Sequence, residues 1–232
     1  DVYKRQPYTL LIMLSSYSVC RAMVMPASFL VVLFYAIYLV VRNGVISYQK
    51  ASGLAMFSGI VIFCFYSFIR LKEMLPVEEY GYDAIFFILL ILCFAWGGDT
   101  CAYFAGRAFG KHKLCPVVSP KKTVEGAVGG VLGTMVFGVL VTVIYSIAAD
   151  RMEEFTRSNI GVSMYVIIAL LACVAAVLGI YGDLFASVVK RQCGIKDYGT
   201  IFPGHGGVLD RFDSVMFIAP FVTMVITAVF YQ

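Results

Sequence analysis

Charged side chains are scarce in this chain of 232 residues. Asp, Glu, Lys and Arg together make up 14% of it, and hydrophobic residues make up 61%. A soluble domain usually has about 25% charged residues, so an ordinary soluble protein is excluded and an integral membrane protein with one helical domain is expected. The net charge of +4 is small and its cations are spread over short loops, so no nucleic acid is expected as a partner.

Patterns typical of several other classes of protein are also absent. The seven cysteines include no C-x-x-C pair and most lie in apolar runs, which favours buried apolar side chains over a metal–thiolate site. No internal repeat, low-complexity tract or long linker divides the chain. The first six residues contain no Met, and we assign no function to them.

Long apolar runs occupy most of the sequence. A helix needs about 20 apolar residues to cross the hydrocarbon core. Seven runs are candidate spans, give or take one or two: 8–25, 26–41, 54–70, 84–97, 126–148, 161–181 and 214–231. The expected fold class is therefore all-α, a polytopic transmembrane protein with about seven spans and a polar site on the cytoplasmic side. The run at 84–97 is short, and its helix has room to continue into the polar segment that follows.

The charges between the runs predict an orientation. Segments 98–125 and 182–213 are rich in Lys and Arg, whereas segments 71–83 and 149–160 are acidic. Because cytoplasmic loops carry an excess of Lys and Arg, one topology fits all four, with both basic segments in the cytoplasm. The helix at 126–148 opens with Gly126, Gly129, Gly130 and Gly133, a spacing that lets a neighbouring helix pack closely.

The first basic segment contains a candidate anion site. Asp99 follows a pair of glycines at the end of a span, and Ser119-Pro120 is a typical helix start. Lys121 and Lys122 would then lie in the first helical turn, where cations are disfavoured unless an anion joins them. Glu125 would lie within reach of Lys121. The alternative is a basic patch that touches anionic lipid headgroups.

The second basic segment begins with a predicted helical stripe. If the helix of the run at 161–181 continues, one face presents Asp183, Ser187, Lys190 and Arg191. A carboxylate beside two cations suits a metal ligand next to a phosphate clamp. The alternative is a solvated stripe at the membrane edge with snorkelling cations.

The sequence IFPGHGGVLDRFDS then supplies a turn and two more carboxylates. Its glycines, among them Gly206 and Gly207, permit a tight turn whose amides can hold an anion. His205 could donate to a phosphate or only orient the loop. If the last helix begins near Val208, Asp210 and Asp213 share one face of its first turn, which suits Mg²⁺. Complementing the helix dipole, with a salt bridge to Arg211, is the alternative.

Residues 187–214, SVVKRQCGIKDYGTIFPGHGGVLDRFDS, closely resemble the signature of the phosphatidate cytidylyltransferases, also called CDP-diacylglycerol synthases. The upstream sequences DTCAYFAGRAFGK and SPKKTVEG are similar to further elements of that family. The resemblance is strong over 98–215, whereas the N-terminal region resembles the family only in its apolar character. We therefore expect an N-terminal transmembrane region at 1–97 and a catalytic transmembrane region at 98–232.

The resemblance implies a reaction, a cofactor and a site. CTP and phosphatidate would give CDP-diacylglycerol and pyrophosphate, with Mg²⁺ required, in the bacterial cytoplasmic (inner) membrane. The partners are then both substrates and membrane lipid, and a homodimer is left open. The metal ligands implied are Asp183, Asp210 and Asp213. The residues expected to hold the triphosphate or assist transfer are Lys190, Arg191, Lys196, Asp197, His205 and Arg211. The other substrate-binding candidates are Asp99, Lys121, Lys122, Ser187, Gly206 and Gly207.

Two other classes of function remain open from the residues alone. A different lipid-phosphate nucleotidyl- or phosphotransferase, for example one acting on an isoprenoid lipid, would need the same charged cleft. A transporter or channel would place ionisable residues near the bilayer midplane, whereas the charges here cluster at the ends of the apolar runs.

Overall fold

The structure is a computed structural model that describes residues 48–151, 161–199 and 206–230. Between 29 and 41 it also describes four separate pairs of helical residues. The chain forms two compact units, residues 1–73 and 74–232. In the first unit, α3 (Tyr48–Met74) begins and runs to the boundary, and its residues Ala55–Met74 are long and apolar enough to span a membrane. The boundary predicted at 97/98 separates an N-terminal transmembrane region from a catalytic region rather than two compact units, and it stays a prediction.

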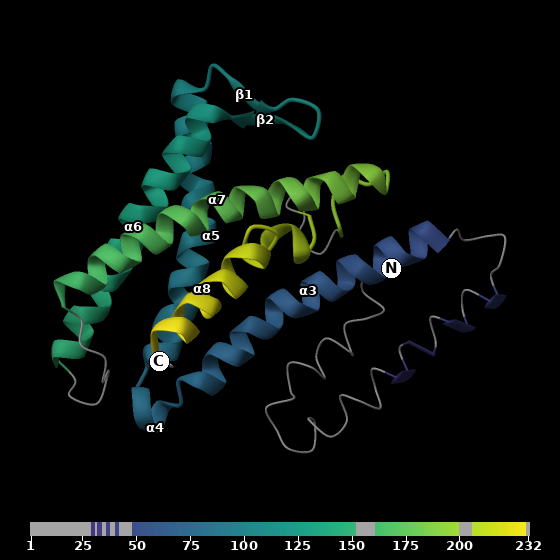
Figure 1. The fold of residues 1–232 in the computed structure, drawn as a ribbon. Coiled ribbons are helices and arrows are strands. Elements are labelled where there is room, and N and C mark those ends of the chain that lie inside the picture. Colours follow the sequence, from purple (N-terminus) through teal and green to yellow (C-terminus); the bar gives the residue numbers. More distant parts are fainter. Residues whose placement is uncertain are drawn as a thin grey trace. The chain divides into compact units, whose positions relative to one another are not determined.

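The second unit is built on a pair of long antiparallel helices. After the short α4 (Val77–Tyr80), α5 (Asp83–Phe109) continues the apolar run at 84–97 through the polar segment, and α6 (Val124–Arg151) returns beside it (Figure 1). An added Cβ on Gly126, Gly129, Gly130 or Gly133 would come within 3.0 Å or less of an atom of α5. The glycines therefore permit close helix packing, as their spacing predicts.

A small β-hairpin joins α5 to α6. Strands β1 (Lys113–Cys115) and β2 (Ser119–Thr123) pair antiparallel, with Lys113 opposite Thr123. The prediction of a helix start at Ser119-Pro120 is therefore wrong. The helix begins five residues later, where the Thr123 hydroxyl accepts the Gly126 backbone N–H at 3.1 Å. Successive side chains of a strand point to opposite sides, so Lys121 is exposed while Lys122 is partly buried.

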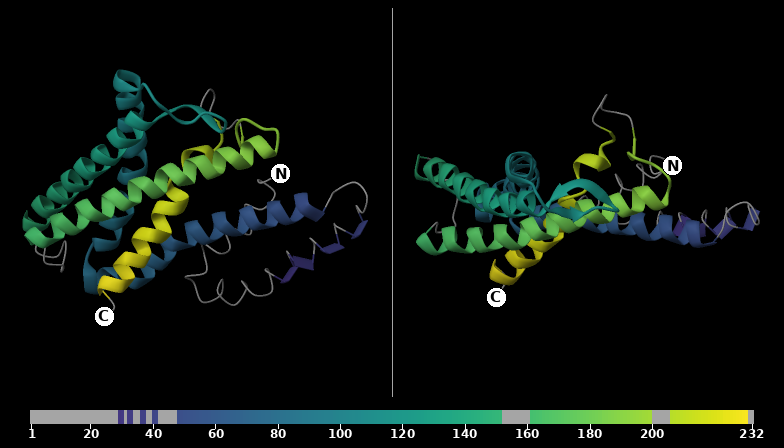
Figure 2. Two further views of the ribbon diagram at one scale, coloured as in Figure 1. Left: turned by 45° about the horizontal axis from the view of Figure 1, so that its top comes forward. Right: turned by 90° about the horizontal axis from the view of Figure 1, so that it is seen from above.

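The remaining elements are α7, η3 and α8. Helix α7 (Val162–Gln192) crosses α5 and α6, and α8 (Val215–Phe230) packs against it (Figure 2). With 31 residues, α7 is about 46 Å long, which exceeds the roughly 30 Å hydrocarbon core. It therefore combines an apolar span with a charged C-terminal end. This agrees with the prediction that the helix of the run at 161–181 continues into the second basic segment.

The segment before α8 differs from the expected helix start near Val208. A single 3₁₀ turn, η3 (Leu209–Arg211), is followed by a turn at 212–214, and α8 begins only at Val215. Asp210 and Asp213 therefore do not share a face of one helical turn. Each carboxylate has its own hydrogen-bond partners, which fix the backbone in this irregular path.

The all-α transmembrane class is confirmed. Among the described residues, four helices are long and apolar enough to cross a membrane, α3, α5, α6 and α7, and α8 is a shorter apolar helix. The run at 8–25 and most of the run at 26–41 lie outside the described residues. The count of about seven spans therefore stays a prediction.

Candidate active site

The polar site of the second unit lies along the C-terminal half of α7. Two glycines of α7 bring α8 and the segment before it against this helix. A Cβ on Gly182 would lie 2.6 Å from the Asp213 carbonyl oxygen, and one on Gly179 would lie 2.9 Å from Ile218. Backbone contact at Gly182 places Asp183, the next residue, beside the turn that carries Asp213.

Asp183 receives a lysine from the hairpin. The Lys122 ammonium lies 2.6 Å from one Asp183 carboxylate oxygen, and the Ser187 hydroxyl donates to the other at 3.3 Å. Both charged side chains are about one quarter exposed. The predicted face of α7 thus forms for Asp183 and Ser187, and β2 supplies the cation.

Lys190 is buried between the two carboxylates of the 206–214 segment. Its ammonium lies 2.9 Å from Asp210 and 3.9 Å from Asp213, and the side chains of the closer pair are only 10% and 7% exposed. It also lies over the ring of Tyr198, 5.3 Å from the centroid. A buried ion pair of this kind survives because hydrogen bonds satisfy its remaining polar atoms.

Asp210 organises the surrounding loops. Its second carboxylate oxygen accepts the backbone N–H groups of Tyr198 at 2.8 Å and Gly207 at 2.9 Å. Gly206 has a φ of +83°, one of the positive backbone dihedrals expected of the glycine turn, whose earlier residues 203–205 lie outside the described part of the chain. The Gly207 amide thus binds an anion that belongs to the chain itself. The Tyr198 hydroxyl donates to the Ala186 carbonyl of α7 at 3.0 Å, which ties the 193–199 loop back to the helix.

Asp213 is buried among like charges. Burial, first, and then the carboxylates of Asp183 and Asp99 raise the pKa of Asp213 from 3.8 to about 7, against the opposing effect of Lys190. One Asp213 oxygen accepts the Ser214 backbone N–H, while the Ser214 hydroxyl donates to Asp99 on α5 at 3.1 Å. Asp99, Asp183 and Asp213, from three separate elements, therefore face a common region.

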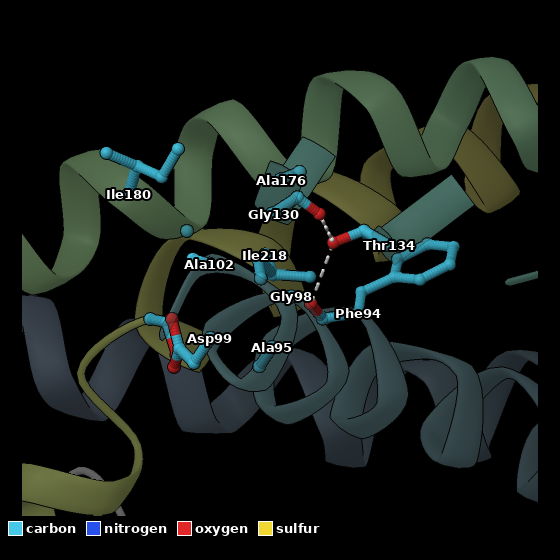
Figure 3. Close-up of a pocket in the computed structure, with 12 residues that line it drawn as sticks. Phe94, Ala95, Gly98, Asp99, Ala102, Gly130, Thr134, Ala176, Ile180 and Ile218 are labelled. Atoms are coloured by element: carbon cyan, nitrogen blue, oxygen red, sulfur yellow. Dashed lines mark hydrogen bonds between the residues drawn. The ribbon is translucent and has the colours of Figure 1, made fainter. Parts of the chain in front are cut away.

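Helix α5 makes a second contact with this segment through Trp96. The indole N–H donates to the Arg211 carbonyl at 3.0 Å, and the ring meets the edge of Phe212 with centroids 5.8 Å apart. A narrow cleft lies beside these contacts, between α5, α6, α7 and the start of α8. Asp99 lies at one end of it, and Phe94 and Thr134 lie at the other (Figure 3).

The donor set suits a hard divalent cation. Mg²⁺ takes one or two carboxylates and completes its shell with water and phosphate oxygens, and a cation would relieve the repulsion that raises the pKa of Asp213. Within the described ranges, no three His, Cys, Asp or Glu side chains form a preassembled metal site. In this conformation Lys122 and Lys190 neutralise the carboxylates, and both oxygens of Asp210 already have partners.

Several other predicted residues are exposed, have other partners than expected, or lie outside the described residues. Four side chains with predicted roles beside the triphosphate are exposed: Arg191, Lys196, Asp197 and Arg211. Lys121 is exposed too, and Glu125 does not pair with it. The Glu125 carboxylate instead accepts the backbone N–H groups of Lys111 and His112, at 3.1 and 3.2 Å, and contacts the His112 ring. His205 lies outside the described residues.

Four residues that shape the site directly were not predicted: Trp96, Gly182, Tyr198 and Ser214. Glu125 was expected to reach Lys121, and its role as the anchor of the hairpin was not predicted. The only available signals were weak. A lone tryptophan beside a glycine pair and a glycine before Asp183 both have ordinary interpretations in a membrane helix.

Comparison with known proteins places this arrangement in context. Residues 3–229 match the model of the cytidylyltransferase family. Relatives named phosphatidate cytidylyltransferase include one from Bacillus subtilis (strain 168), 32% identical over 82% of this chain and 64% of its own length. Another, from Staphylococcus haemolyticus (strain JCSC1435), is 38% identical over 62% of this chain and 50% of its own. The chain thus spans between half and two thirds of the length of these relatives.

Proposed function

Because the chain belongs to the cytidylyltransferase family, we propose that it transfers the cytidylyl group of CTP to phosphatidate, giving CDP-diacylglycerol and pyrophosphate. The observation that supports this most is the cluster of buried and partly buried lysines and aspartates at the charged end of α7. Two relatives that carry the name of this activity match 82% and 62% of the chain.

The proposed reaction exchanges one phosphoanhydride bond for another. An oxygen of the lipid phosphate attacks the α-phosphorus of CTP, and the bond from that phosphorus to the pyrophosphate oxygen breaks. The lipid phosphate is already anionic near neutral pH, so no strong base is needed. The difficulty is to bring two polyanions together, which requires positive charge placed beforehand.

Lys122 and Lys190 are the cations that the fold places best for this. Each contacts a carboxylate, at 2.6 and 2.9 Å. Phosphate oxygens would compete for the same ammonium groups and form charge-assisted hydrogen bonds of similar strength. Lys121, Arg191, Lys196 and Arg211 are exposed, and we propose that their positive charge attracts the triphosphate.

Mg²⁺ is the cofactor we propose, held by Asp183 and Asp213 with Asp99 nearby. Bound there, it would supply positive charge for the triphosphate oxygens. Asp210 remains a proposed metal ligand. Because its carboxylate already binds Lys190 and a loop amide, Lys190 must release it before it can bind the metal. Asp197 and His205 keep their predicted roles beside the nucleotide.

We further propose that the protein spans the bacterial cytoplasmic membrane with the site facing the cytoplasm. The hairpin and the C-terminal end of α7, which meet at Lys122 and Asp183, belong to the two basic segments of the chain. The positive-inside rule assigns such segments to the cytoplasm, where CTP is available.

The deciding experiment is an assay of the purified chain in lipid micelles, with wild type beside Asp213→Asn. Wild type should give CDP-lipid from CTP and phosphatidate only with Mg²⁺, and the variant should lose at least about 100-fold in rate. Replacing phosphatidate by a polyprenyl phosphate tests the alternative function, in which the substrate is an isoprenoid lipid. Near-normal turnover by the variant would contradict the role of Asp213, and absence of product from wild type would contradict the function.

A further inference from the structure

Trp96 is the only tryptophan of the chain, and it contacts a segment 115 positions away. Its indole N–H donates to the Arg211 carbonyl at 3.0 Å, and its ring packs against the edge of Phe212. Arg211 is the last residue of the 3₁₀ turn and Phe212 immediately precedes Asp213. The contacts therefore reach the backbone beside a proposed metal ligand.

The segment that they reach has little regular structure of its own. Between residue 206 and the start of α8 there are only the three-residue turn η3 and the turn at 212–214, so side-chain contacts add to a few backbone hydrogen bonds in setting its path. Asp210 fixes the first part by binding the Gly207 and Tyr198 amides. The second part, which carries Asp213, lies against α5.

Helix α5 holds that second part at two points on either side of Asp213. Trp96 binds the carbonyl two residues before it, and Asp99 binds the hydroxyl of Ser214, the residue after it. Trp96 and Asp99 are three residues apart and so lie on one face of the helix. The Asp213 backbone is thereby fixed from α5 on one side and by Gly182 of α7 on the other.

We propose that Trp96 is a positioning residue, which fixes the Arg211–Asp213 backbone so that the Asp213 carboxylate faces Asp183 and Lys190. The inference rests on the proposed function for the importance of Asp213, and it assigns Trp96 no contact with substrate. The competing role is that of an interfacial anchor, since tryptophan favours the membrane–water boundary and this side chain is 45% exposed. An anchor would need the amphipathic ring in lipid but no bond to the loop.

The test combines kinetics with the emission of this single tryptophan. Trp96→Phe keeps an aromatic ring against Phe212 and removes the indole donor. Phe104→Leu, an exposed aromatic of the same helix, is the matched control and retains Trp96. We expect Trp96→Phe to raise KM for CTP by about 3- to 10-fold, the value of one neutral hydrogen bond, with wild-type helix content. Phe104→Leu should match wild type.

The second readout does not depend on turnover. Adding Mg²⁺ alone, and then CTP, should change the tryptophan emission of wild type and of Phe104→Leu, and Asp213→Asn should abolish the response to Mg²⁺. A Trp96→Phe variant with wild-type kinetics, or an emission unaffected by both ligands, would overturn the inference. If wild type makes no CDP-lipid while its emission responds to Mg²⁺ through Asp213, the proposed function fails and the positioning role stands. If Trp96→Phe does not fold, the tryptophan emission of wild type and of Asp213→Asn decides whether Trp96 is a positioning residue.

Discussion

Asp213 is the residue at which folding and binding impose opposite demands. Its side chain is only 10% exposed and faces Asp183 and Asp99, and among the described residues Lys190, at 3.9 Å, is the cation that contacts it. A carboxyl group in such a place favours its neutral form. This arrangement of carboxylates is unfavourable by itself and becomes favourable when a cation is bound, which is a common property of binding sites.

A pH dependence of stability follows from the raised pKa of Asp213. In the folded protein this pKa is about 7 and the unfolded reference is 3.8, so between these values the folded state binds the additional proton. The stabilisation of the folded state that this proton contributes is lost as the pH rises between these two pKa values. Asp213→Asn removes the carboxyl group, so the variant should become progressively more stable than wild type from about pH 4 to about pH 7.

Denaturant unfolding in micelles, wild type beside variant across that range, measures the difference. Titrating groups distant from Asp213 cancel because they are common to both proteins, whereas Asp99 and Asp183 are coupled to it and contribute to the difference. A stability difference that does not change with pH would contradict the raised pKa. Saturating Mg²⁺ should stabilise wild type and leave Asp213→Asn unchanged.

At the scale of elements, contact between α7 and the segment before α8 depends on Gly182. A methyl group there would lie 2.6 Å from the Asp213 carbonyl oxygen and 3.1 Å from Phe217. Because the first contact is with backbone, the two elements must separate, and overpacking of this kind costs about 1–3 kcal/mol.

We therefore expect Gly182→Ala to lower the unfolding free energy by about that amount and to reduce CDP-lipid formation about tenfold or more. Gly53→Ala on α3 is the matched control, since an added Cβ there meets no atom within 4 Å. It should be neutral or stabilise by up to about 1 kcal/mol. Equal behaviour of the two variants would show that the close approach at Gly182 has no importance.

The hairpin depends on Glu125 in a similar way. The carboxylate accepts two backbone N–H groups at the end of the α5–β1 connection, while Thr123 packs against Gly106 and Gly110 at the same base. Glu125→Ala removes the first anchor, and we expect trypsin to cleave the exposed lysines of the hairpin roughly several-fold faster, since local opening of the hairpin no longer breaks these hydrogen bonds.

The rate of trypsin cleavage is measured on gels. The control variant is Glu79→Ala, which changes an exposed glutamate of α4. Activity should fall with Glu125→Ala because Lys122 lies on this hairpin and contacts Asp183. Unchanged cleavage and unchanged activity would together refute the anchoring role.

At the scale of the whole molecule, the arrangement of helices predicts which ends face which compartment. Val117, in the hairpin, is 92% exposed, and Val162, at the start of α7, is 83% exposed. One membrane span, α6, lies between the hairpin and α7. In a cysteine-free background that retains activity, Val117→Cys should react with a membrane-impermeant maleimide only from the cytoplasmic face, and Val162→Cys only from the opposite face. Labelling of both from one face would contradict the topology.

Much of the helical framework was predictable because its causes are local. Apolar length locates the helices, and helical periodicity places Asp183 and Ser187 on one face of α7. The hairpin was not predictable, since strands of three and five residues carry little pattern and Ser119-Pro120 has the form of a helix start. The start of α8 was misplaced for a related reason, because Asp210 and Asp213 stabilise turns through contacts with distant residues.

The sequence alone determined that this is a helical membrane protein with its charges gathered at the ends of its spans, because hydrophobicity and charge act through composition and short-range order. It also supplied the family resemblance and the residue types of the site. Only the tertiary structure decided which cation meets which carboxylate: Lys122 reaches Asp183 from a strand, Lys190 lies between Asp210 and Asp213, and Trp96 holds the segment that carries Asp213. These pairings depend on how closely the helices approach and how they are rotated, and glycines such as Gly182 set that approach through contacts between residues distant in the chain.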